Sequence, residues 1–410
     1  MKLNAIIAGV GMTRFSKHRD RTLKSLAGEA INAALLDAGL EAKDLQAAYM
    51  GNAAAAFITG QLCVPGEIVL RDLGIGSIPV INVENACATA STALNQAAAM
   101  VTFGAYDVVL ACGYEKLTHE DKSKSFAVFA AAVDVEAMDE LAASVDAKMR
   151  AVGIEPDPAQ AAGRSLFMDI YATEAIAHMQ KYGTTQAQLA AVSAKNSRHG
   201  HLNPRAQFRE EVSVAQVLAS REIVYPLTLP MCSPIGDGAA AVILVSERKA
   251  RELGLKKPVS IRSSVLQSGW DHADTDTAAV FRRAADAAYS EAGIGPADLD
   301  VVELHDASAS SEILHTEYLR LCADGAGGPL VESGATSLGG AIPVNPSGGL
   351  LRKGHPIGAT GIAQIVELTE QLQGRSGARQ VDGARVGLAE NGGGYVRGDV
   401  AALVVTIIAS

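Results

Sequence analysis

Three short segments of the chain carry the residue types that covalent acyl transfer needs. Cys87 stands in Val-Glu-Asn-Ala-Cys-Ala-Thr-Ala-Ser, between the apolar run Ile78–Val83 and an alanine-rich helix. His355 lies in Gly-His-Pro-Ile-Gly-Ala-Thr-Gly, and His305 opens His-Asp-Ala-Ser after another apolar run. A cysteine and two histidines at strand-to-helix junctions predict nucleophilic catalysis through an acyl thioester.

The position of Cys87 at the start of a helix bears on its ionisation. The amide end of a helix carries partial positive charge, which favours the thiolate, the form that attacks a carbonyl carbon. We therefore expect an anionic Cys87 sulfur that faces the two imidazoles.

The elements that position these residues are duplicated. The segment Ala33–Leu45 matches Ala287–Leu299, and in both copies an amphipathic helix ends at a glycine and is followed by Asp-Leu and an apolar strand. The first copy then runs through Ile78–Val83, the helix after Cys87 and Val108–Leu110. The second copy runs through Val301–Leu304, the helix after His355 and Val386–Leu388. Strands that alternate with helices predict an α/β fold with parallel or mixed sheets covered on both faces.

A stretch between the copies matches neither and divides the chain. We predict a first half at residues 1–115 plus 226–257, a mostly helical insertion at 116–225 and a second half at 258–410. The insertion is expected to break near Glu155–Pro158, to end in an irregular polar segment, His199–Glu211, and to lie on the rim of the first half. Loops outside the carboxyl ends of strands are where ligands bind in such sheets.

Composition excludes several classes of partner. The net charge of -10, without a basic stripe, argues against nucleic acid, and no apolar run approaches the roughly 18 residues of a membrane span. The five cysteines are odd in number and lack a C-x-x-C pair, which favours a reducing cytoplasm and no zinc site. The N-terminus is expected to be a first strand and not a signal peptide. His199-Gly-His201 lacks further ligands, so no metal is expected, and the acidic segment Asp271–Asp276 is expected to be solvated.

Together these motifs resemble the thiolase superfamily over essentially the whole chain. Ser-Pro-Ile-Gly-Asp-Gly-Ala from Ser233 and Glu-Asn-Gly-Gly-Gly from Glu390 join the cysteine and histidine segments in the family's order. The His-Asp pair is most similar to the sterol-carrier-protein (lipid-transfer) branch, because other thiolases have Asn-Glu there. The resemblance implies duplicated βαβαβ halves in a layered α-β-α-β-α core, with the insertion as a loop domain.

The resemblance also implies roles for individual residues. Cys87 would be acylated, and His355 would activate its thiol and help His305 to form an oxyanion hole. The backbone N–H groups of Cys87 and Gly392 would form a second hole, and such donors are typically worth about 2.7–4 kcal/mol each. Ser233 matches a position that lines the pantetheine pocket, whereas Asp237 is expected to shape a turn.

One departure from the family concerns the second cysteine, which moves the proton at carbon. Its two usual positions hold Glu390 and Ala307. Glu390 could act as the base if burial raises its pKa, or it could only hydrogen-bond the adjacent turn, and Asp306 is a weaker candidate. The remaining cysteines are expected to be small core residues, namely Cys63, Cys112, Cys232 and Cys322.

The resemblance therefore predicts cleavage of a 3-oxoacyl-CoA through S-acyl-Cys87, with coenzyme A as co-substrate and no cofactor bound by this chain. The missing cysteine suggests an aromatic, branched or steroid-like substrate, for example benzoylsuccinyl-CoA. The family further implies a homodimer or higher homo-oligomer and a possible small OB-fold, zinc-ribbon partner. Two alternatives stay open: a decarboxylating ketoacyl synthase that uses Cys-His-His, and a non-catalytic acyl-CoA-binding scaffold subunit.

Overall fold

The computed structural model describes residues 3–155, 165–270 and 278–410. The predicted acidic segment 271–276 and most of the predicted helix break lie outside these ranges. The first repeat comprises β1 (Ile6–Met12), α1 (Leu23–Ala38), β2 (Ala47–Gly51), α2 (Ala56–Thr59), α3 (Pro65–Asp72), β3 (Val80–Val83), α4 (Thr89–Thr102) and β4 (Val108–Glu115).

The intervening segment and the return to the first repeat follow. The intervening segment comprises α5 (Lys122–Ala130), α6 (Met138–Ala151), α8 (Leu166–Tyr182), α9 (Gln186–Leu202), α10 (Val214–Leu218) and the hairpin β5 (Glu222–Val224) and β6 (Leu227–Thr228). The chain then returns to the first repeat in β7 (Gly238–Val245) and α11 (Glu247–Leu253).

The second repeat has a similar succession of elements, without a named strand that corresponds to β3. It comprises β8 (Val259–Gln267), α12 (Ala279–Ala292), β9 (Val301–Glu303), α13 (Ala309–Tyr318), α14 (Gly327–Glu332), α15 (Gly349–Lys353), α16 (Thr360–Gln373), β10 (Val386–Val396) and β11 (Asp399–Ala409). The chain therefore has the α/β class that the alternating pattern predicts.

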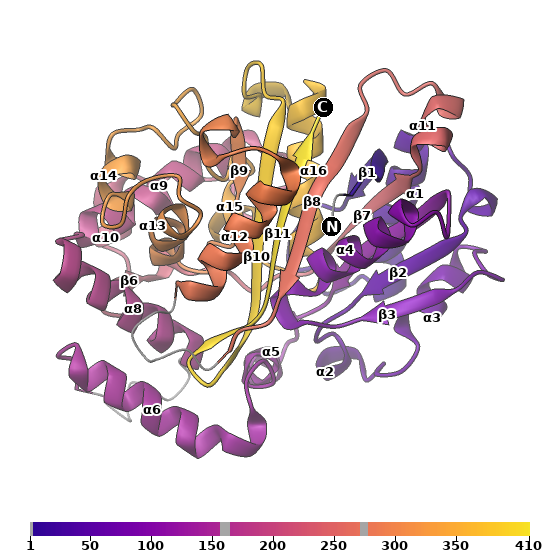
Figure 1. Cartoon of the computed structure of the whole chain (residues 1–410). Coiled ribbons are helices and arrows are strands. Elements are labelled where there is room, and N and C mark those ends of the chain that lie inside the picture. The colour runs from indigo at the N-terminus through magenta and orange to yellow at the C-terminus, as the bar shows by residue number, and fades with distance from the viewer. Residues whose placement is uncertain (1–2, 156–164, 271–277) are drawn as a thin grey trace.

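The strand order makes the duplication visible. The nine-stranded sheet runs β3-β2-β4-β7-β1-β8-β11-β10-β9 (Figure 1). On each side of the β1–β8 junction the pairings are antiparallel, antiparallel and then parallel. Residues Ile6 and Ile7 pair with Ser260 and Val259, so this short junction joins the two repeats into one sheet.

The matched helix ends have the same local structure in both repeats. Gly39 and Gly293 are left-handed C-caps, and a single 3-10 turn follows each of them. The strands that come next are β2 and β9, so β9 corresponds to β2 and not to Ile78–Val83, with which the sequence pattern aligns it. The counterpart of β3 is reduced to an isolated parallel bridge between Val302 and Val344.

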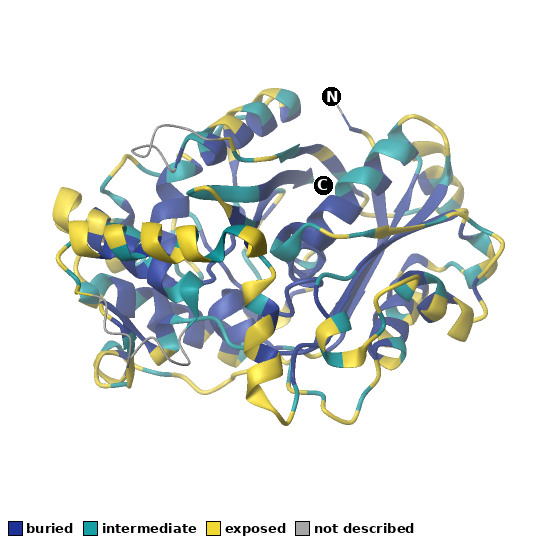
Figure 2. Ribbon diagram, turned by 90° about the horizontal axis from the view of Figure 1, so that it is seen from below, coloured by how far each residue is buried: buried dark blue, intermediate teal, exposed yellow. Residues whose placement is uncertain are grey.

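The layers follow from the alternation of side chains along the strands. Along β4, Val109 and Ala111 face α4 and α16, whereas Leu110 and Cys112 face α1. Helix α12 covers the outer face of the second repeat, and α4 and α16 pack against each other between the two parts of the sheet. This is the predicted α-β-α-β-α order of layers. Figure 2 shows that the strands of the sheet are buried almost throughout, whereas exposed residues lie on the outer helices and loops.

The insertion is mostly helical, as predicted, but its position differs from the prediction. Its core includes Ile313, Val331 and Leu351 of the second repeat, and α9 packs on α13, α14 and α15. The insertion therefore covers the second repeat as well as the rim of the first. Helix α9 also continues to Leu202, so the first residues of the segment predicted to be irregular are helical. The predicted domain boundaries remain a prediction.

Two further expectations from the sequence can be compared with the structure. Of the four cysteines expected in the core, Cys112 is buried, Cys232 and Cys322 are half-buried, and Cys63 is exposed. Cys63 was therefore wrongly assigned, because it lies in an exposed loop before α3.

In the described part of the chain, none of the helices has both the length and the apolar character that crossing a membrane requires.

Gly361 allows the starts of α4 and α16 to meet. A Cβ at this position would lie 2.7 Å from the backbone nitrogen of Ser91, and still closer to its hydroxyl. Because backbone atoms of α4 occupy that space, any side chain at position 361 forces the two central helices apart.

We therefore predict that Gly361→Ala lowers the free energy of unfolding by about 1–3 kcal/mol, the usual cost of overpacking a core. Urea denaturation measures it. Gly76→Ala is the control, because no atom lies within 4 Å of the added Cβ, and its effect should stay within about 0.5 kcal/mol. Equal effects of the two substitutions would contradict the close approach.

Candidate active site

Cys87 lies on a tight turn that the sequence folds immediately before α4. Ala86 has a left-handed φ of 49°, a conformation that costs a non-glycine residue on the order of 1 kcal/mol or more. The Glu84 carboxylate accepts a hydrogen bond from the N–H of Ala86, and the Thr89 hydroxyl accepts one from Asn85 at 2.9 Å. The turn therefore holds the Cys87 sulfur in one place.

The glycine run of β10 packs directly on this turn. A Cβ on Gly393 would lie 2.4 Å from the carbonyl oxygen of Asn85 and 2.9 Å from the nitrogen of Cys87. Only a bare backbone fits there. Gly392, the residue predicted to supply an oxyanion donor, lies beside it and lines the same cavity as Cys87.

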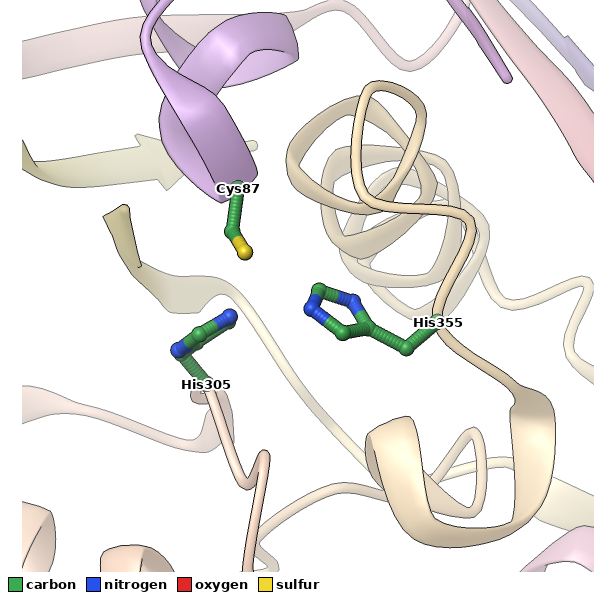
Figure 3. Close-up of side chains that lie close together, drawn as sticks. All are labelled: Cys87, His305 and His355. Atoms are coloured by element: carbon green, nitrogen blue, oxygen red, sulfur yellow. The ribbon is translucent and has the colours of Figure 1, made fainter. Parts of the chain in front are cut away.

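The structure brings the three predicted side chains together. The Cys87 sulfur and one ring nitrogen each of His305 and His355 lie within 4.8 Å of one another (Figure 3). The two imidazole rings meet edge to face, with centroids 5.1 Å apart. His305 follows β9 and His355 follows α15, so two loops of the second repeat face a turn of the first.

The resting state of Cys87 differs from the predicted thiolate. Burial, and then the negative charge of Glu115, raise the pKa of the Cys87 thiol to about 12. Desolvation disfavours the charged sulfur, and it outweighs the hydrogen bond to the backbone that lowers the pKa of this thiol. The sulfur is therefore protonated at neutral pH, and a nearby base must remove its proton before it can attack.

His355 has the tautomer that such a base needs. Its Nδ1 lies 2.8 Å from the Thr360 hydroxyl, which donates its own hydrogen to the Pro356 carbonyl at 3.1 Å. Thr360 can therefore only accept, so Nδ1 carries the hydrogen and Nε2 carries the lone pair. Figure 3 shows Nε2 directed toward Cys87 and His305. Burial and the neighbouring His305 hold the pKa of His355 well below its usual range, so the ring is neutral.

His305 is also neutral, and one of its ring nitrogens is buried without a hydrogen-bond partner in the described chain. Burial lowers its pKa to about 4, against the opposing pull of Glu390. Its Nε2 is buried and has no hydrogen-bond partner among the described residues. A buried polar atom without a partner is unusual, and here it borders the cavity beside the sulfur.

Glu115 fixes the loop that carries His355, and sequence reasoning missed it. Its carboxylate is fully buried at the end of β4 and accepts backbone N–H groups of Gly358 at 3.0 Å and Ala54 at 3.2 Å. These hydrogen bonds tie the second repeat to the first beside Cys87. No local pattern marks Glu115, because its partner Gly358 is 243 residues away.

Glu390 lacks the raised pKa that its proposed role as a base requires, and Asp306 lies away from the cavity. Glu390 does not have a raised pKa: its burial is outweighed by the adjacent His315 and His305, and its pKa is lowered. Burial and Glu312 raise the pKa of Asp306 well above its usual range. Asp306, however, accepts the Leu350 N–H at 2.7 Å and lies outside the lining of the cavity, so it anchors the start of α15.

A cavity of about 340 Å³ extends from the three side chains. This volume falls within the range of small-molecule sites. Four of the eight phenylalanines of the chain line it, as do three of its nine tyrosines. These aromatic residues are Phe126, Phe129, Phe167, Phe281, Tyr171, Tyr318 and Tyr395.

Some of the other residues that line this cavity were predicted from the sequence, and others were not. Ser233 and Cys232 line it, so the Ser-Pro-Ile-Gly-Asp-Gly segment reaches the site. Asp237 of that segment is fully buried and accepts backbone N–H groups of Leu117 and Thr118. His315 and Glu174 also line the cavity and were missed, because no motif surrounds them.

The His199-Gly-His201 segment is separate from this site. His199 is buried, accepts the Leu338 N–H at its Nε2 and places its Nδ1 3.0 Å from the Asn345 carbonyl. Burial lowers its pKa to about 3. Both ring nitrogens of His199 therefore have backbone hydrogen-bond partners in the core.

Comparisons with known proteins agree with this geometry. The family description "Thiolase, N-terminal domain" matches residues 5–224, and "Thiolase C-terminal domain-like" matches residues 265–406. The chain belongs to the thiolase family. It is therefore an acyltransferase of the thiolase type, whose members act on acyl-CoA and coenzyme A.

The relatives of this thiolase carry different names. The acetyl-CoA acetyltransferase of Methanothermobacter thermautotrophicus is 39% identical over 392 residues, covering 95% of this chain and 96% of the relative. Sterol carrier protein 2 of Bos taurus is 36% identical, covering 95% of this chain and 70% of the relative. Benzoylsuccinyl-CoA thiolase subunit BbsB of Thauera aromatica is 36% identical, covering 95% of both. The predicted likeness to the sterol-carrier-protein branch is confirmed.

Solved structures agree with the fold. The Ltp2-ChsH2(DUF35) aldolase matches with a TM-score of 0.76 at 24% identity, covering 98% of this chain and 97% of that chain. Human mitochondrial 3-ketoacyl-CoA thiolase in complex with CoA matches with a TM-score of 0.71 at 16% identity, covering 100% and 98%.

The burial of Glu115 predicts a pH dependence of stability. Desolvation raises its pKa from 4.5 to about 7, so the folded protein binds this proton more tightly than the unfolded chain. The contribution of Glu115 is therefore most favourable below pH 4.5 and is lost as pH rises through about 7.

We expect the difference in unfolding free energy between wild type and Glu115→Gln to fall across this window by on the order of 3 kcal/mol. Urea denaturation of both proteins at a series of pH values measures it. A difference that stays constant or grows with pH would contradict the buried, proton-binding carboxyl.

Proposed function

We propose that this thiolase cleaves a 3-oxoacyl-CoA that bears a bulky, aromatic acyl group, through an S-acyl-Cys87 intermediate. The observation that supports the acyl class most directly is the concentration of aromatic side chains around the cavity, in a chain with only 4% aromatic residues. Aromatic rings contact other aromatic groups with favourable geometry and large buried area. The name of the BbsB relative, which includes benzoylsuccinyl-CoA, supports the same class.

The first half-reaction begins with the protonated thiol. Nε2 of His355 accepts the Cys87 proton as the sulfur attacks the keto carbon of the substrate. The oxygen of the tetrahedral adduct takes on negative charge, and preorganised N–H donors stabilise it. In this proposal His305 and His355 supply one oxyanion hole, and the backbone N–H groups of Cys87 and Gly392 supply the other.

Coenzyme A is the co-substrate in this proposal, and no cofactor is bound by this chain. Ser233 lies where the pantetheine arm is expected to pass, since it lines the cavity next to Cys232. Coenzyme A receives the acyl group from Cys87 in the second half-reaction.

Assembly and context form part of the same proposal. We expect a homodimer or higher homo-oligomer, supported by the position of β3 at one edge of the sheet. A partner subunit is supported by the DUF35 component in the name of one structural neighbour and by the word subunit in the BbsB name. We expect this partner to be a small OB-fold, zinc-ribbon protein. We place the enzyme in the cytoplasm, in the degradation of aromatic or lipid acyl chains.

The decisive experiment uses benzoylacetyl-CoA and coenzyme A. We predict formation of benzoyl-CoA and acetyl-CoA, with a benzoyl group on Cys87 detectable by peptide mass spectrometry when coenzyme A is omitted. Cys87→Ala should show neither product nor adduct. Acetoacetyl-CoA, with its small acyl group, should be cleaved with lower kcat/KM, because it leaves the aromatic cavity unfilled.

Other outcomes would identify the alternatives. Release of carbon dioxide from malonyl-CoA with condensation, and no cleavage of benzoylacetyl-CoA, would indicate a decarboxylating ketoacyl synthase. Binding of acyl-CoA without an adduct on Cys87 would indicate a scaffold subunit.

The Thr360 hydroxyl gives a second prediction, because it sets the tautomer of His355. Thr360→Val removes the acceptor for Nδ1–H and should lower kcat for benzoylacetyl-CoA by roughly 10- to 100-fold, less than the 10²–10⁴ that a general base contributes. Thr369→Val is the matched control on the same helix, since its buried hydroxyl has no hydrogen-bond partner in the described ranges. Equal activity of the two variants would contradict the role of Thr360.

A further inference from the structure

A histidine–carboxylate pair borders the cavity and is used by none of the steps above. Nδ1 of His315, on α13, lies 2.9 Å from a carboxylate oxygen of Glu390, on β10. His315 lines the same cavity as Cys87, whereas Glu390 lies behind it, outside the lining. The two residues are 75 positions apart in the sequence, so no sequence motif contains both of them.

Glu390 is held as a fixed, ionised partner. It is fully buried, and the oxygen that contacts His315 also accepts the backbone N–H of His305 at 3.0 Å. Gln364 donates to the carbonyl of Glu390 at 2.9 Å, which fixes the backbone at this point. The positive charge of His315 contributes to the lowered pKa of the Glu390 carboxyl. A carboxylate in this state keeps the hydrogen of His315 on Nδ1.

The ring of His315 is held with its other nitrogen unused. It packs against Phe281, with centroids 4.6 Å apart, and lies 5.9 Å from the ring of Tyr318. Within the ranges that the structure covers, Nε2 forms no hydrogen bond. Because Nδ1 points to the carboxylate behind the cavity wall, Nε2 is the nitrogen left for a bound molecule.

We propose that His315 is the acid and base that moves the proton at the α carbon of the substrate, with Glu390 as its positioning residue. The inference rests on the proposed function, since it assigns the carbon–carbon step of that reaction. Glu390 stands at one of the two positions where the resemblance to thiolases places the second cysteine, and we assign the role of that cysteine to the neighbouring His315 imidazole.

In the cleavage direction, the proton that His315 gives to carbon is returned to it by coenzyme A. The bond between the α carbon and the keto carbon breaks, and its electron pair passes to the α carbon as the Cys87 thioester forms. The α carbon takes the proton from Nε2 of the His315 imidazolium, and the shortened acyl-CoA leaves. Neutral His315 then accepts the thiol proton of coenzyme A, whose sulfur attacks the thioester. The Cys87 sulfur leaves and regains its proton from His355.

The charges around His315 suit both states of the ring. Glu390 faces it from β10 and Glu174 from α8, while His305 approaches from the loop before α13. Two carboxyl groups can stabilise the imidazolium, and the neutral ring keeps a lone pair on Nε2. General acid–base groups of this kind contribute about 10²–10⁴-fold.

A second buried histidine–glutamate pair provides a matched comparison. His178 places Nε2 3.0 Å from Glu317 and Nδ1 2.8 Å from the Thr184 hydroxyl, so both of its nitrogens are occupied. It is buried to a similar degree as His315 but lies outside the lining of the Cys87 cavity. It therefore controls for the loss of a buried imidazole.

The test separates acylation of Cys87 from proton transfer at carbon. Para-nitrophenyl thiobenzoate acylates a thiol without needing a proton for its leaving group, and the released thiolate is coloured. The asparagine of His315→Asn keeps a hydrogen-bond donor for Glu390. We expect this variant to release the first equivalent of coloured thiolate, the burst that reports acylation of Cys87, at a rate within about 3-fold of wild type. Its kcat for benzoylacetyl-CoA should fall by about 100-fold or more. His178→Asn should retain both reactions.

Glu390→Gln keeps the hydrogen-bond acceptor for His315 and removes the negative charge. It tests the same pair independently if His315→Asn fails to fold. We expect an intact burst, about 10-fold slower cleavage and an alkaline limb of the pH profile that moves to lower pH, because the cationic ring loses a stabilising partner. Cleavage by His315→Asn within about 3-fold of wild type, or a Glu390→Gln profile identical to wild type, would overturn the inference. Absence of the burst in wild type would instead overturn the proposed function.

Discussion

The site depends on the closeness of a protonated, half-buried thiol and an unprotonated imidazole, whose reactive atoms lie within 4.8 Å of each other. Burial raises the pKa of Cys87 and lowers that of His355, so both groups are uncharged before substrate arrives. Charge then develops only as the sulfur attacks, at the point where fixed donors can stabilise it. An ion pair at rest would need permanent solvation that this cavity does not provide.

The duplicated fold is what brings the two groups together. Cys87 precedes α4 and His355 precedes α16, and these helices pack against each other between the two parts of the sheet. The Glu115 carboxylate holds the His355 loop from the opposite repeat, and Gly361 permits the close approach of the helix starts. Since no covalent bond crosses this contact in the described chain, the geometry of the site relies on the packing of the repeats.

Much of the site could be predicted from the sequence because Cys87, His305 and His355 each lie in a recognisable segment at a strand-to-helix junction. The thiolate was predicted wrongly, because the sequence indicates the helix end but not the degree of burial. Glu115, His315 and the ionised state of Glu390 could not be predicted, since each depends on a partner distant in sequence. The packing of the insertion on the second repeat was missed for the same reason.

The resting ionisation of Cys87 is the most direct test of this account. The thiolate absorbs in the ultraviolet, so the difference in absorbance between wild type and Cys87→Ala can be followed as a function of pH. We predict no thiolate at neutral pH and a rise only as pH approaches about 12. A thiolate step near neutral pH, abolished by His355→Ala, would reveal an ion pair at rest and contradict the account.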